Sequence, residues 1–264
     1  MIKQAIIPLA GLGTRLLPLT SVFAKELLPI NGKPGLEYIL DECIGAGIKE
    51  IIFIISKRKM MIKKYFYNDK FYKELIKKKK DTRVIAEYKK ILKYRKMIKF
   101  VYQNKPKGTG DAVLKTKKYI KDNYFLMLLP DDLIIKKNCS KSMIISHKKY
   151  KASVMASMNV NKKTVERWGI YKLNKKLNKN DYLINSVVEK PNIKDAPSNK
   201  AVIGRYILPN KIFSKLRNLK PSKGGEIHIT DAIQLLINDN EKFIAHNFSG
   251  KYLDCGSMEG YINS

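Results

Sequence analysis

Glycines and charged side chains follow the first short apolar run of the sequence, residues 4–9. Gly11 and Gly13 come directly after it, Arg15 lies two residues further on, and Lys25 follows ten residues after Arg15. Backbone N–H groups at a glycine turn can approach a phosphate chain closely, and the positive end of a following helix attracts anions. Two cations beside such a turn suit the binding of a triphosphate.

The glycine turn matches neither of the two common phosphate-binding motifs. A dinucleotide fingerprint requires a third glycine, where this chain has Leu16, and a Walker A loop requires a following Gly-Lys-Ser/Thr. A glycine turn after a strand also has a purely structural explanation, since glycine adopts backbone conformations that other residues avoid. The two cations favour the phosphate-binding interpretation.

Two aspartates also follow short apolar runs. Asp131 comes after residues 124–129, and Asp254 comes after Tyr252 and Leu253. Carboxylates at the carboxyl ends of strands lie where open α/β sheets bind their ligands, and hard oxygen ligands suit Mg²⁺. The alternative is that both are turn-forming or helix-capping residues. We expect Asp132 to be a turn residue or to support the site from behind.

The elements that must position these residues alternate between strands and helices. Apolar runs of strand length at 4–9, 51–56 and 124–129 suit a sheet buried on both faces. Helical spacing of apolar residues at 36–46 and 109–121 separates them. This alternation predicts an α/β fold with a mostly parallel sheet.

The remainder of the chain has a different character. Residues 57–98 are Lys-rich and amphipathic, which predicts a solvated helical insertion. After residue 151 the pattern predicts shorter strands at 153–159, 168–173, 185–189 and 201–208, with turns at 161–163 and 175–181. We expect a single domain over 1–264, in which the part after residue 151 forms a substrate-facing lobe over the same sheet.

The composition limits the class of protein. The chain has 264 residues, 44% of them hydrophobic, which is enough for a sizeable core. It contains no apolar run of membrane-spanning length and no evident signal peptide, and its three cysteines lack metal or disulfide spacing. These features predict a cytoplasmic protein with no membrane partner.

The formal net charge of +30 raises the question of nucleic-acid binding. Only seven of the 53 basic residues are arginine, and the lysines are spread along the helical patterns. Proteins that read bases rely on the bidentate geometry of arginine. The charge therefore indicates compositional drift and weak, salt-sensitive binding to polyanions, with no specific nucleic-acid partner.

The string GLGTRLLPLTSVFAKELLPINGKP at 11–34 resembles the signature of sugar-1-phosphate nucleotidylyltransferases. With Glu26 and the motifs that follow, the chain is most similar to the bacterial uridylyltransferases that act on UTP and glucose 1-phosphate. The later motifs stand in the family's order: QNKPKGTGDAV (103–113), LPDD (129–132), WGIY (168–171), VVEKP (187–191), AVIGRYIL (201–208), GGEIHITDAI (224–233) and YLDCG (252–256).

The resemblance implies a nucleotidyltransferase fold, with a Rossmann-like mixed sheet flanked by helices and a sugar-binding lobe. It implies a nucleotide-binding half at 1–150 and a sugar-phosphate-binding half at 151–264. It implies that the nucleotide is held by Ala10, Gly11, Gly13, Thr14, Arg15, Lys25, Gln103 and Gly108. A side-chain amide such as Gln103 can both donate and accept, as the edge of uracil requires.

The resemblance also implies the remaining parts of the site. Gly169, Glu189 and Lys190 would bind the sugar and its phosphate, while Asp131 and Asp254 would hold Mg²⁺. The implied reaction joins UTP and glucose 1-phosphate into UDP-glucose and releases pyrophosphate, with Arg15, Lys25, Asp131 and Lys190 as the catalytic side chains. A homo-oligomer is a further partner that the family suggests.

Three alternatives stay open at this point. The first is another nucleotide or sugar, as in a thymidylyltransferase. The second is a non-catalytic paralogue. The argument against it is the retention of the residues that the family's chemistry needs, namely Arg15, Lys25, Asp131, Lys190 and Asp254. The third is a basic nucleic-acid-binding protein, which would account for the charge and for none of the motifs.

Overall fold

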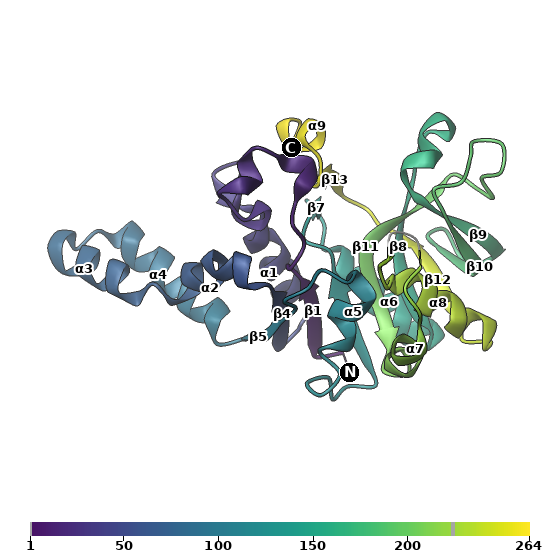
Figure 1. Cartoon of the computed structure of the whole chain (residues 1–264), viewed down its shortest axis with the longest axis horizontal. Coiled ribbons are helices and arrows are strands. Elements are labelled where there is room, and N and C mark those ends of the chain that lie inside the picture. The colour runs from purple at the N-terminus through teal and green to yellow at the C-terminus, as the bar shows by residue number, and fades with distance from the viewer. Residues whose placement is uncertain (1, 223–224) are drawn as a thin grey trace.

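The computed structural model describes residues 2–222 and 225–264. Its centre is a nine-stranded mixed sheet with the strand order β5-β4-β1-β6-β11-β8-β12-β10-β9 (Figure 1). The strands are β1 (Gln4–Pro8), β4 (Glu50–Ile55), β5 (Ile98–Tyr102), β6 (Tyr124–Leu128), β8 (Ser153–Asn159), β9 (Gly169–Lys176), β10 (Asp181–Glu189), β11 (Lys200–Pro209) and β12 (Phe243–Asn247). The predicted α/β fold is confirmed.

The N-terminal half of the sheet is parallel and buried on both faces. Strand β1 pairs in parallel with β4 and β6, and β4 pairs in parallel with β5. Successive residues of a strand point to opposite faces. Accordingly, Ile7 belongs to the apolar cluster on one face of the sheet and Ile6 to the cluster on the other. The continuous apolar runs in the sequence therefore reflect a sheet covered on both sides.

The C-terminal half is mainly antiparallel. Strand β11 joins the two halves by pairing antiparallel with β6 and with β8, and β10 pairs antiparallel with β12 and β9. Strands β9 and β10 are longer than the sequence pattern predicted. The turn predicted at 175–181 is confined to residues 177–180, because Lys175 and Lys176 pair across the hairpin with Leu183 and Tyr182.

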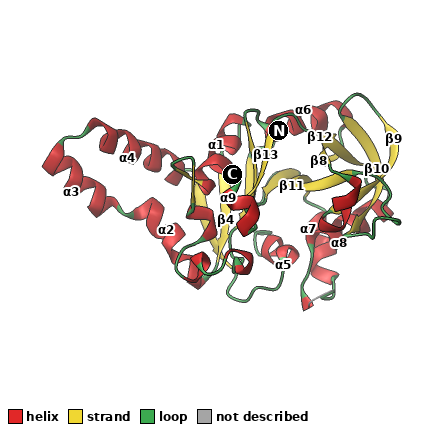
Figure 2. Cartoon of the chain, turned by 90° about the horizontal axis from the view of Figure 1, so that it is seen from above, coloured by secondary structure: helices red, strands yellow, loops and turns green. Residues whose placement is uncertain are grey.

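Helices cover both faces of the sheet (Figure 2). Helices α1 and α6 contribute buried residues to one apolar cluster, and α5, α7 and α8 contribute to the other. Their bounds are α1 (Gly35–Gly45), α5 (Thr109–Leu114), α6 (Cys139–Tyr150), α7 (Ile212–Asn218) and α8 (Ile229–Asn238).

Helix α5 is shorter than the helical pattern at 109–121 predicted. The hydroxyl of Thr116 donates to the carbonyl of Val113 at 2.7 Å, and the Thr116 N–H bonds the same carbonyl at 2.9 Å. These bonds to the residue three positions earlier replace the helical ladder and end the helix in turns.

The Lys-rich insertion is helical, as predicted, and extends from the body of the protein as an arm at the left of Figure 1. It consists of α2 (Met60–Tyr67), α3 (Asp69–Lys79) and α4 (Thr82–Arg95). Helices α2 and α4 are anchored by buried residues, including Phe66 and Tyr94. All of α3 is described, and none of its residues is buried. The solvated part of the insertion is therefore its tip.

Short strands outside the main sheet complete the fold. Strand β7 (Asp132–Ile135) pairs antiparallel with β13 (Lys251–Asp254), so that Asp132 lies opposite Asp254. Strands β2 (Pro29–Ile30) and β3 (Lys33–Pro34) form a hairpin, and α9 (Met258–Ile262) follows β13. The β7–β13 pair brings a segment near the C-terminus beside the carboxyl end of β6. Within the described ranges, no helix is long and apolar enough to cross a membrane.

Candidate active site

The glycine loop follows β1 directly, as the sequence predicted. Gly13 has a φ of 74°, in the left-handed region. A Cβ at this position would lie 3.0 Å from Cγ2 of Thr20, whose hydroxyl donates to the Gly13 carbonyl at 2.8 Å. Both the backbone conformation and the close neighbour therefore require glycine here. In this conformation the residues from Ala10 to Thr14 line a cavity.

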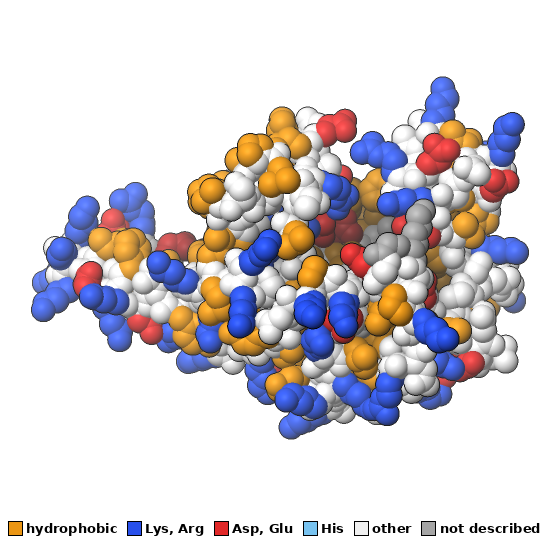
Figure 3. Space-filling view, in the orientation of Figure 1, with side chains coloured by type: hydrophobic (Ala, Val, Ile, Leu, Met, Phe, Trp, Pro, Cys, Tyr) orange, Lys and Arg blue, Asp and Glu red, His pale blue; other side chains and the backbone are white. Residues whose placement is uncertain are grey.

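A cavity of about 390 Å³ is lined by the predicted nucleotide-binding residues with the exception of Arg15. Its lining comes from the glycine loop, from the segment after β5 and from the end of β6. The lining residues are Pro8, Ala10, Gly11, Leu12, Gly13, Thr14, Lys25, Glu26, Gln103, Pro106, Gly108, Thr109, Ala112, Leu129, Pro130, Asp131 and Glu226. Figure 3 shows a hollow near the middle of the molecule, with acidic side chains inside it.

Lys25, Asp131 and Arg15 form a charged cluster at this cavity. The Lys25 Nζ lies 2.7 Å from Asp131 Oδ2, and the Arg15 guanidinium lies 3.5 Å from the same oxygen. Burial favours the neutral form of both Lys25 and Asp131, but their mutual attraction outweighs it. The pKa of Lys25 is therefore raised and that of Asp131 lowered, so both remain charged. The roles predicted for them, a phosphate contact and a metal ligand, require this pair to separate.

Gln103 and Gly108 lie together on the opposite wall. Gly108 has a φ of 92°, and a Cβ there would come within 2.5 Å of the Ile227 carbonyl oxygen. The Gln103 amide nitrogen donates to the Gly108 carbonyl at 3.1 Å and to Asp111 Oδ2 at 2.7 Å. The amide therefore cannot both donate to and accept from a base, as the sequence had suggested, because its N–H groups are already taken.

Asp254 lies beside the Asp131–Asp132 segment through the β7–β13 pairing. One of its carboxylate oxygens accepts the Gly256 N–H at 2.9 Å, and the other accepts the Ser257 hydroxyl at 2.9 Å. The Cys255 N–H in turn donates to the Asp131 carbonyl at 2.8 Å. Asp254 thus stabilises the turn before α9 and still carries lone pairs that could bind a cation.

Asp132 supports the site from behind. Its Oδ2 accepts the Gly204 N–H at 2.8 Å, and its Oδ1 accepts the Tyr252 hydroxyl at 2.6 Å. The Tyr252 ring meets the Trp168 ring edge-on at a centroid distance of 5.9 Å. Burial and the neighbouring charge of Asp131 raise the pKa of Asp132. Asp132 therefore links the Asp131 segment to β11 and, through Tyr252, to the segment of Trp168.

The three predicted sugar-binding residues lie together at the ends of β9 and β10. Gly169 pairs with Glu189, and a Cβ on Gly169 would lie 3.1 Å from Glu189 Oε2. Lys190 has a left-handed φ of 46°, and its N–H donates to the Trp168 carbonyl at 3.0 Å. None of the three lines the 390 Å³ cavity, so the structure presents the predicted nucleotide and sugar sets as two separate groups.

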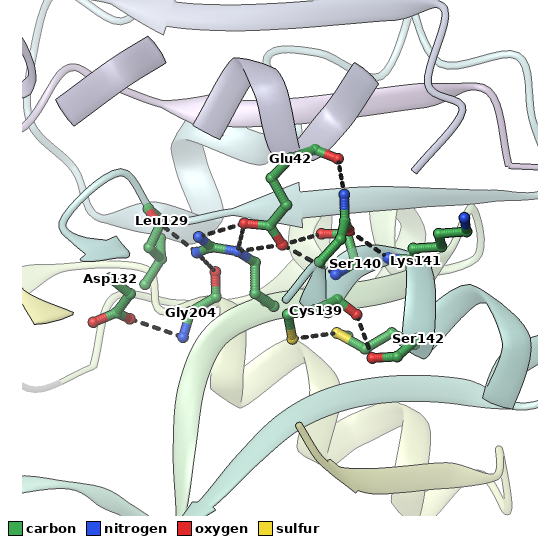
Figure 4. A network of polar contacts seen from close by, with 11 residues as sticks. Glu42, Leu129, Asp132, Cys139, Ser140, Lys141, Ser142 and Gly204 are labelled. Atoms are coloured by element: carbon green, nitrogen blue, oxygen red, sulfur yellow. Dashed lines mark hydrogen bonds and ion pairs between the residues drawn. The ribbon is translucent and has the colours of Figure 1, made fainter. Parts of the chain in front are cut away.

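A buried ion pair that the sequence did not predict stabilises the end of β6 (Figure 4). Arg205 is fully buried, and its Nη2 lies 2.9 Å from Glu42 Oε2. Its Nη1 donates to the carbonyls of Leu129 and Gly204, while Glu42 also accepts from Ser140. Burial alone would lower the pKa of Arg205, but Glu42 raises it. Because Leu129 is two residues from Asp131, this network holds the segment that carries the predicted metal ligand.

The sequence did not predict two further buried pairs of oppositely charged or titratable side chains. Lys59 Nζ lies 2.7 Å from Glu26 Oε2, which ties the segment beside Lys25 to the start of the arm. His246 Nδ1 lies 2.6 Å from Asp181 Oδ1, and neither residue lines the cavity. The sequence shows the charged residues but carries no signal of which partner each one meets.

No group of three or more His, Cys, Asp or Glu side chains within residues 2–222 and 225–264 is arranged to hold a metal ion. Asp131 and Asp254 supply two carboxylates on adjoining segments, so other ligands would have to come from substrate and water. This fits Mg²⁺, which keeps several waters and takes one or two carboxylates with phosphate oxygens.

The first glycine of the predicted 224–233 motif, Gly224, lies outside the described residues.

The chain is similar to known proteins over its whole length. The chain is 36% identical over 277 residues to a UTP–glucose-1-phosphate uridylyltransferase of Streptococcus pyogenes, covering all of this chain and 89% of that protein. A crystal structure of UDP-glucose pyrophosphorylase complexed with UDP-glucose matches with a TM-score of 0.86 and 37% identity, covering 100% of this chain and 97% of the other.

A UTP-bound UGPase from Acinetobacter baumannii matches with a TM-score of 0.89 and 34% identity, covering 100% of this chain and 92% of that one. A thymidylyltransferase structure from Bacillus anthracis, at 23% identity and a TM-score of 0.77, shares the fold. The Nucleotidyl transferase family matches residues 4–264. With this match over nearly its whole length, the chain belongs to the nucleotidyl transferase family.

Proposed function

We propose that the protein transfers a uridylyl group from UTP to α-D-glucose 1-phosphate, giving UDP-glucose and pyrophosphate. The observation that carries the proposal is the single cavity in which the glycine loop, the Lys25–Asp131 cluster and Gln103 meet. A backbone turn with cations suits a triphosphate, and an amide on the opposite wall suits a base. The names of the full-length relatives supply the choice of UTP and glucose 1-phosphate.

The reaction needs no general base. A phosphate oxygen of the sugar phosphate attacks the α-phosphorus of UTP, and the bond from that phosphorus to the β-phosphate oxygen breaks, so that pyrophosphate leaves. The second pKa of a phosphate monoester is about 6, so the nucleophile is already ionised at neutral pH. Catalysis therefore rests on bringing two polyanions together and offsetting their charge.

The chain's own cations fit these tasks. Arg15, 68% of whose side chain is exposed, is free to turn toward the leaving pyrophosphate, and Lys25 would leave Asp131 for the UTP phosphates. Lys190 would hold the phosphate of the sugar, and Glu189 would accept from sugar hydroxyls. The left-handed conformation of Lys190 fits a functional position, since strain of this kind gathers at binding sites.

Enzymes of this family generally use a divalent metal ion. We assign Mg²⁺ to Asp131 and Asp254. When bound, the ion would neutralise phosphate charge and fix the approach of the two substrates. Asp131 can accept this role because its neighbour Lys25 has an alternative anionic partner in the triphosphate.

The decisive experiment measures pyrophosphate release by the purified protein with UTP, glucose 1-phosphate and Mg²⁺. We expect turnover that EDTA abolishes and Mg²⁺ restores. Asp131→Asn should abolish turnover without unfolding the protein, whereas Asp254→Asn should cost less or be partly rescued by more Mg²⁺. Turnover with dTTP that exceeds turnover with UTP would assign the chain to thymidylyl transfer instead. Full activity of Asp131→Asn, or turnover in excess EDTA, would show that the metal is misplaced.

A further inference from the structure

The side-chain amide of Gln103 is locked in one orientation. Its nitrogen lies 2.7 Å from Asp111 Oδ2 and 3.1 Å from the Gly108 carbonyl oxygen, and only 4% of the residue is exposed. A carbonyl oxygen and an ionised carboxylate only accept hydrogen bonds, whereas the amide nitrogen only donates. Reversing the amide would set its oxygen against two acceptors. The assignment of nitrogen and oxygen is therefore dictated by the neighbours.

Both partners of the amide are themselves held in place. Asp111 is 9% exposed, and its other carboxylate oxygen lies 3.5 Å from the Lys115 ammonium. The Gly108 carbonyl belongs to a turn that is fixed by the left-handed φ of Gly108 and by a 2.7 Å bond from the Gly110 N–H to the Ile227 carbonyl. The wall around Gln103 is thus preorganised.

The locked amide leaves only its oxygen to meet a ligand. Gln103 borders two adjoining cavities, and Ala10 and Pro106 line both of them. An acceptor that faces N3 of the base favours a base that carries a hydrogen on this atom. Uracil and thymine carry a hydrogen on N3, whereas N3 of cytosine is an acceptor. An acceptor facing an acceptor costs the desolvation of both groups without a hydrogen bond in return.

From this geometry we propose that Asp111 is a specificity-determining residue, which holds Gln103 with its amide oxygen toward the base and thereby selects a uracil-type nucleotide over a cytosine nucleotide. The inference rests on the proposed function, because it takes Gln103 to face N3 of the base of the nucleotide substrate. It goes beyond that function by naming the residue that sets the hydrogen-bonding polarity of the base pocket.

The test is Asp111→Asn, which keeps the size of the side chain but adds donors. The Asn amide can then turn to face either orientation of Gln103. Of the two acceptors that fix the amide, the Gly108 carbonyl remains, so the orientation that presents the Gln103 nitrogen to N3 of cytosine is opposed by one acceptor in place of two. We expect the ratio of kcat/KM for UTP to kcat/KM for CTP to fall by about tenfold or more, the scale of discrimination from one well-formed base contact. Thermal unfolding would establish that the variant is folded, and Asp111→Ala offers a second variant that releases the amide.

Two control variants separate this role from a general effect. Lys115→Met removes the ion pair of Asp111 but leaves its bond to Gln103, so the ratio should stay within about twofold of the wild-type value. Asp41→Asn makes the same chemical change at an aspartate that accepts from Tyr94 and pairs with Lys33, and it should leave the ratio unchanged.

A binding measurement gives an outcome that does not depend on turnover. Calorimetric titration with UDP and with CDP should show a preference for UDP in the wild type and a reduced preference in Asp111→Asn. Equal affinities in the wild type, or an unchanged preference in both folded Asp111 variants, would overturn the inference. A wild type that prefers UDP but transfers no uridylyl group would instead refute the proposed function and leave the role of Asp111 supported.

Discussion

The buried pair of Glu42 and Arg205 should dominate the stability of the region behind the active site. Both oxygens of Glu42 accept hydrogen bonds, from the Arg205 guanidinium and from the Ser140 N–H and hydroxyl. In Glu42→Gln the new amide nitrogen must face one of these donors, whichever way it turns. The variant therefore leaves a fully buried guanidinium without its counter-charge and creates a donor–donor contact.

The expected loss is large. Removing one partner of a buried ion pair costs about 3–5 kcal/mol, because the remaining charge stays buried. Unfolding entropy is roughly 2.1 cal/mol/K per residue. Over 264 residues the loss corresponds to a fall in Tm of about 5–9 °C. Because Arg205 also donates to the Leu129 carbonyl, kcat should fall as well through displacement of Asp131.

Thermal unfolding followed by circular dichroism measures the effect, with Glu74→Gln as the matched control. Glu74 meets Lys70 at 4.0 Å on the outside of α3, and 57% of its side chain is exposed. Exposed pairs of this kind contribute at most about 1 kcal/mol, so the control should lower Tm by no more than about 2 °C. Equal shifts in the two variants would refute the view that burial makes the Glu42–Arg205 pair important.

Three further predictions concern the sugar site, pH and the net charge. Lys190→Ala should raise the KM for glucose 1-phosphate or lower its kcat/KM by roughly tenfold to a hundredfold, because one charge-assisted contact contributes about 1.5–3 kcal/mol. The KM for UTP should change little. Steady-state kinetics with each substrate varied will show whether the loss is confined to the sugar phosphate. Burial would raise the pKa of Asp181, but hydrogen bonding, chiefly from His246, lowers it below its ordinary 3.8. The carboxylate therefore stabilises the fold above that pH and loses this contribution as pH falls through its lowered pKa. Tm measured from pH 6 down to pH 3 should accordingly fall less steeply in Asp181→Asn than in the wild type, and parallel curves would contradict the assignment. DNA binding, followed by fluorescence anisotropy, should weaken steeply with salt and show no sequence preference, and selective binding at physiological salt would give the +30 charge a function.

The sequence by itself determined the first half of the sheet and the glycine loop. The apolar run after Lys3 predicted a strand covered on both faces, and in the structure Ile6 and Ile7 are both fully buried although they point in opposite directions. Gly13 needs a left-handed backbone within a few residues of that strand. Such features are local, because periodicity and backbone freedom are properties of neighbouring residues.

Some parts of the site could be anticipated only through the order of motifs. Asp254 follows a short apolar stretch, but nothing in its neighbourhood shows that it lies beside Asp131. The pairing of β7 with β13 decides this, and it joins segments that are more than a hundred residues apart. Strand pairing depends on which edges the rest of the fold leaves open, and the period of a strand does not encode its partner.

Tertiary structure alone decided which charges meet and how Gln103 is turned. Arg205 stands in an apolar strand, where its sequence neighbours give no indication that Glu42, 163 positions away, neutralises it. Any of the 23 acidic residues could have been its partner as far as the sequence shows. From the sequence, the Gln103 amide could both donate to and accept from a ligand. In the structure, Asp111 and the Gly108 carbonyl accept from its nitrogen, so only its oxygen is left to meet a ligand. A hydrogen bond requires donor and acceptor within about 3 Å, a condition that depends on the packing of the whole chain.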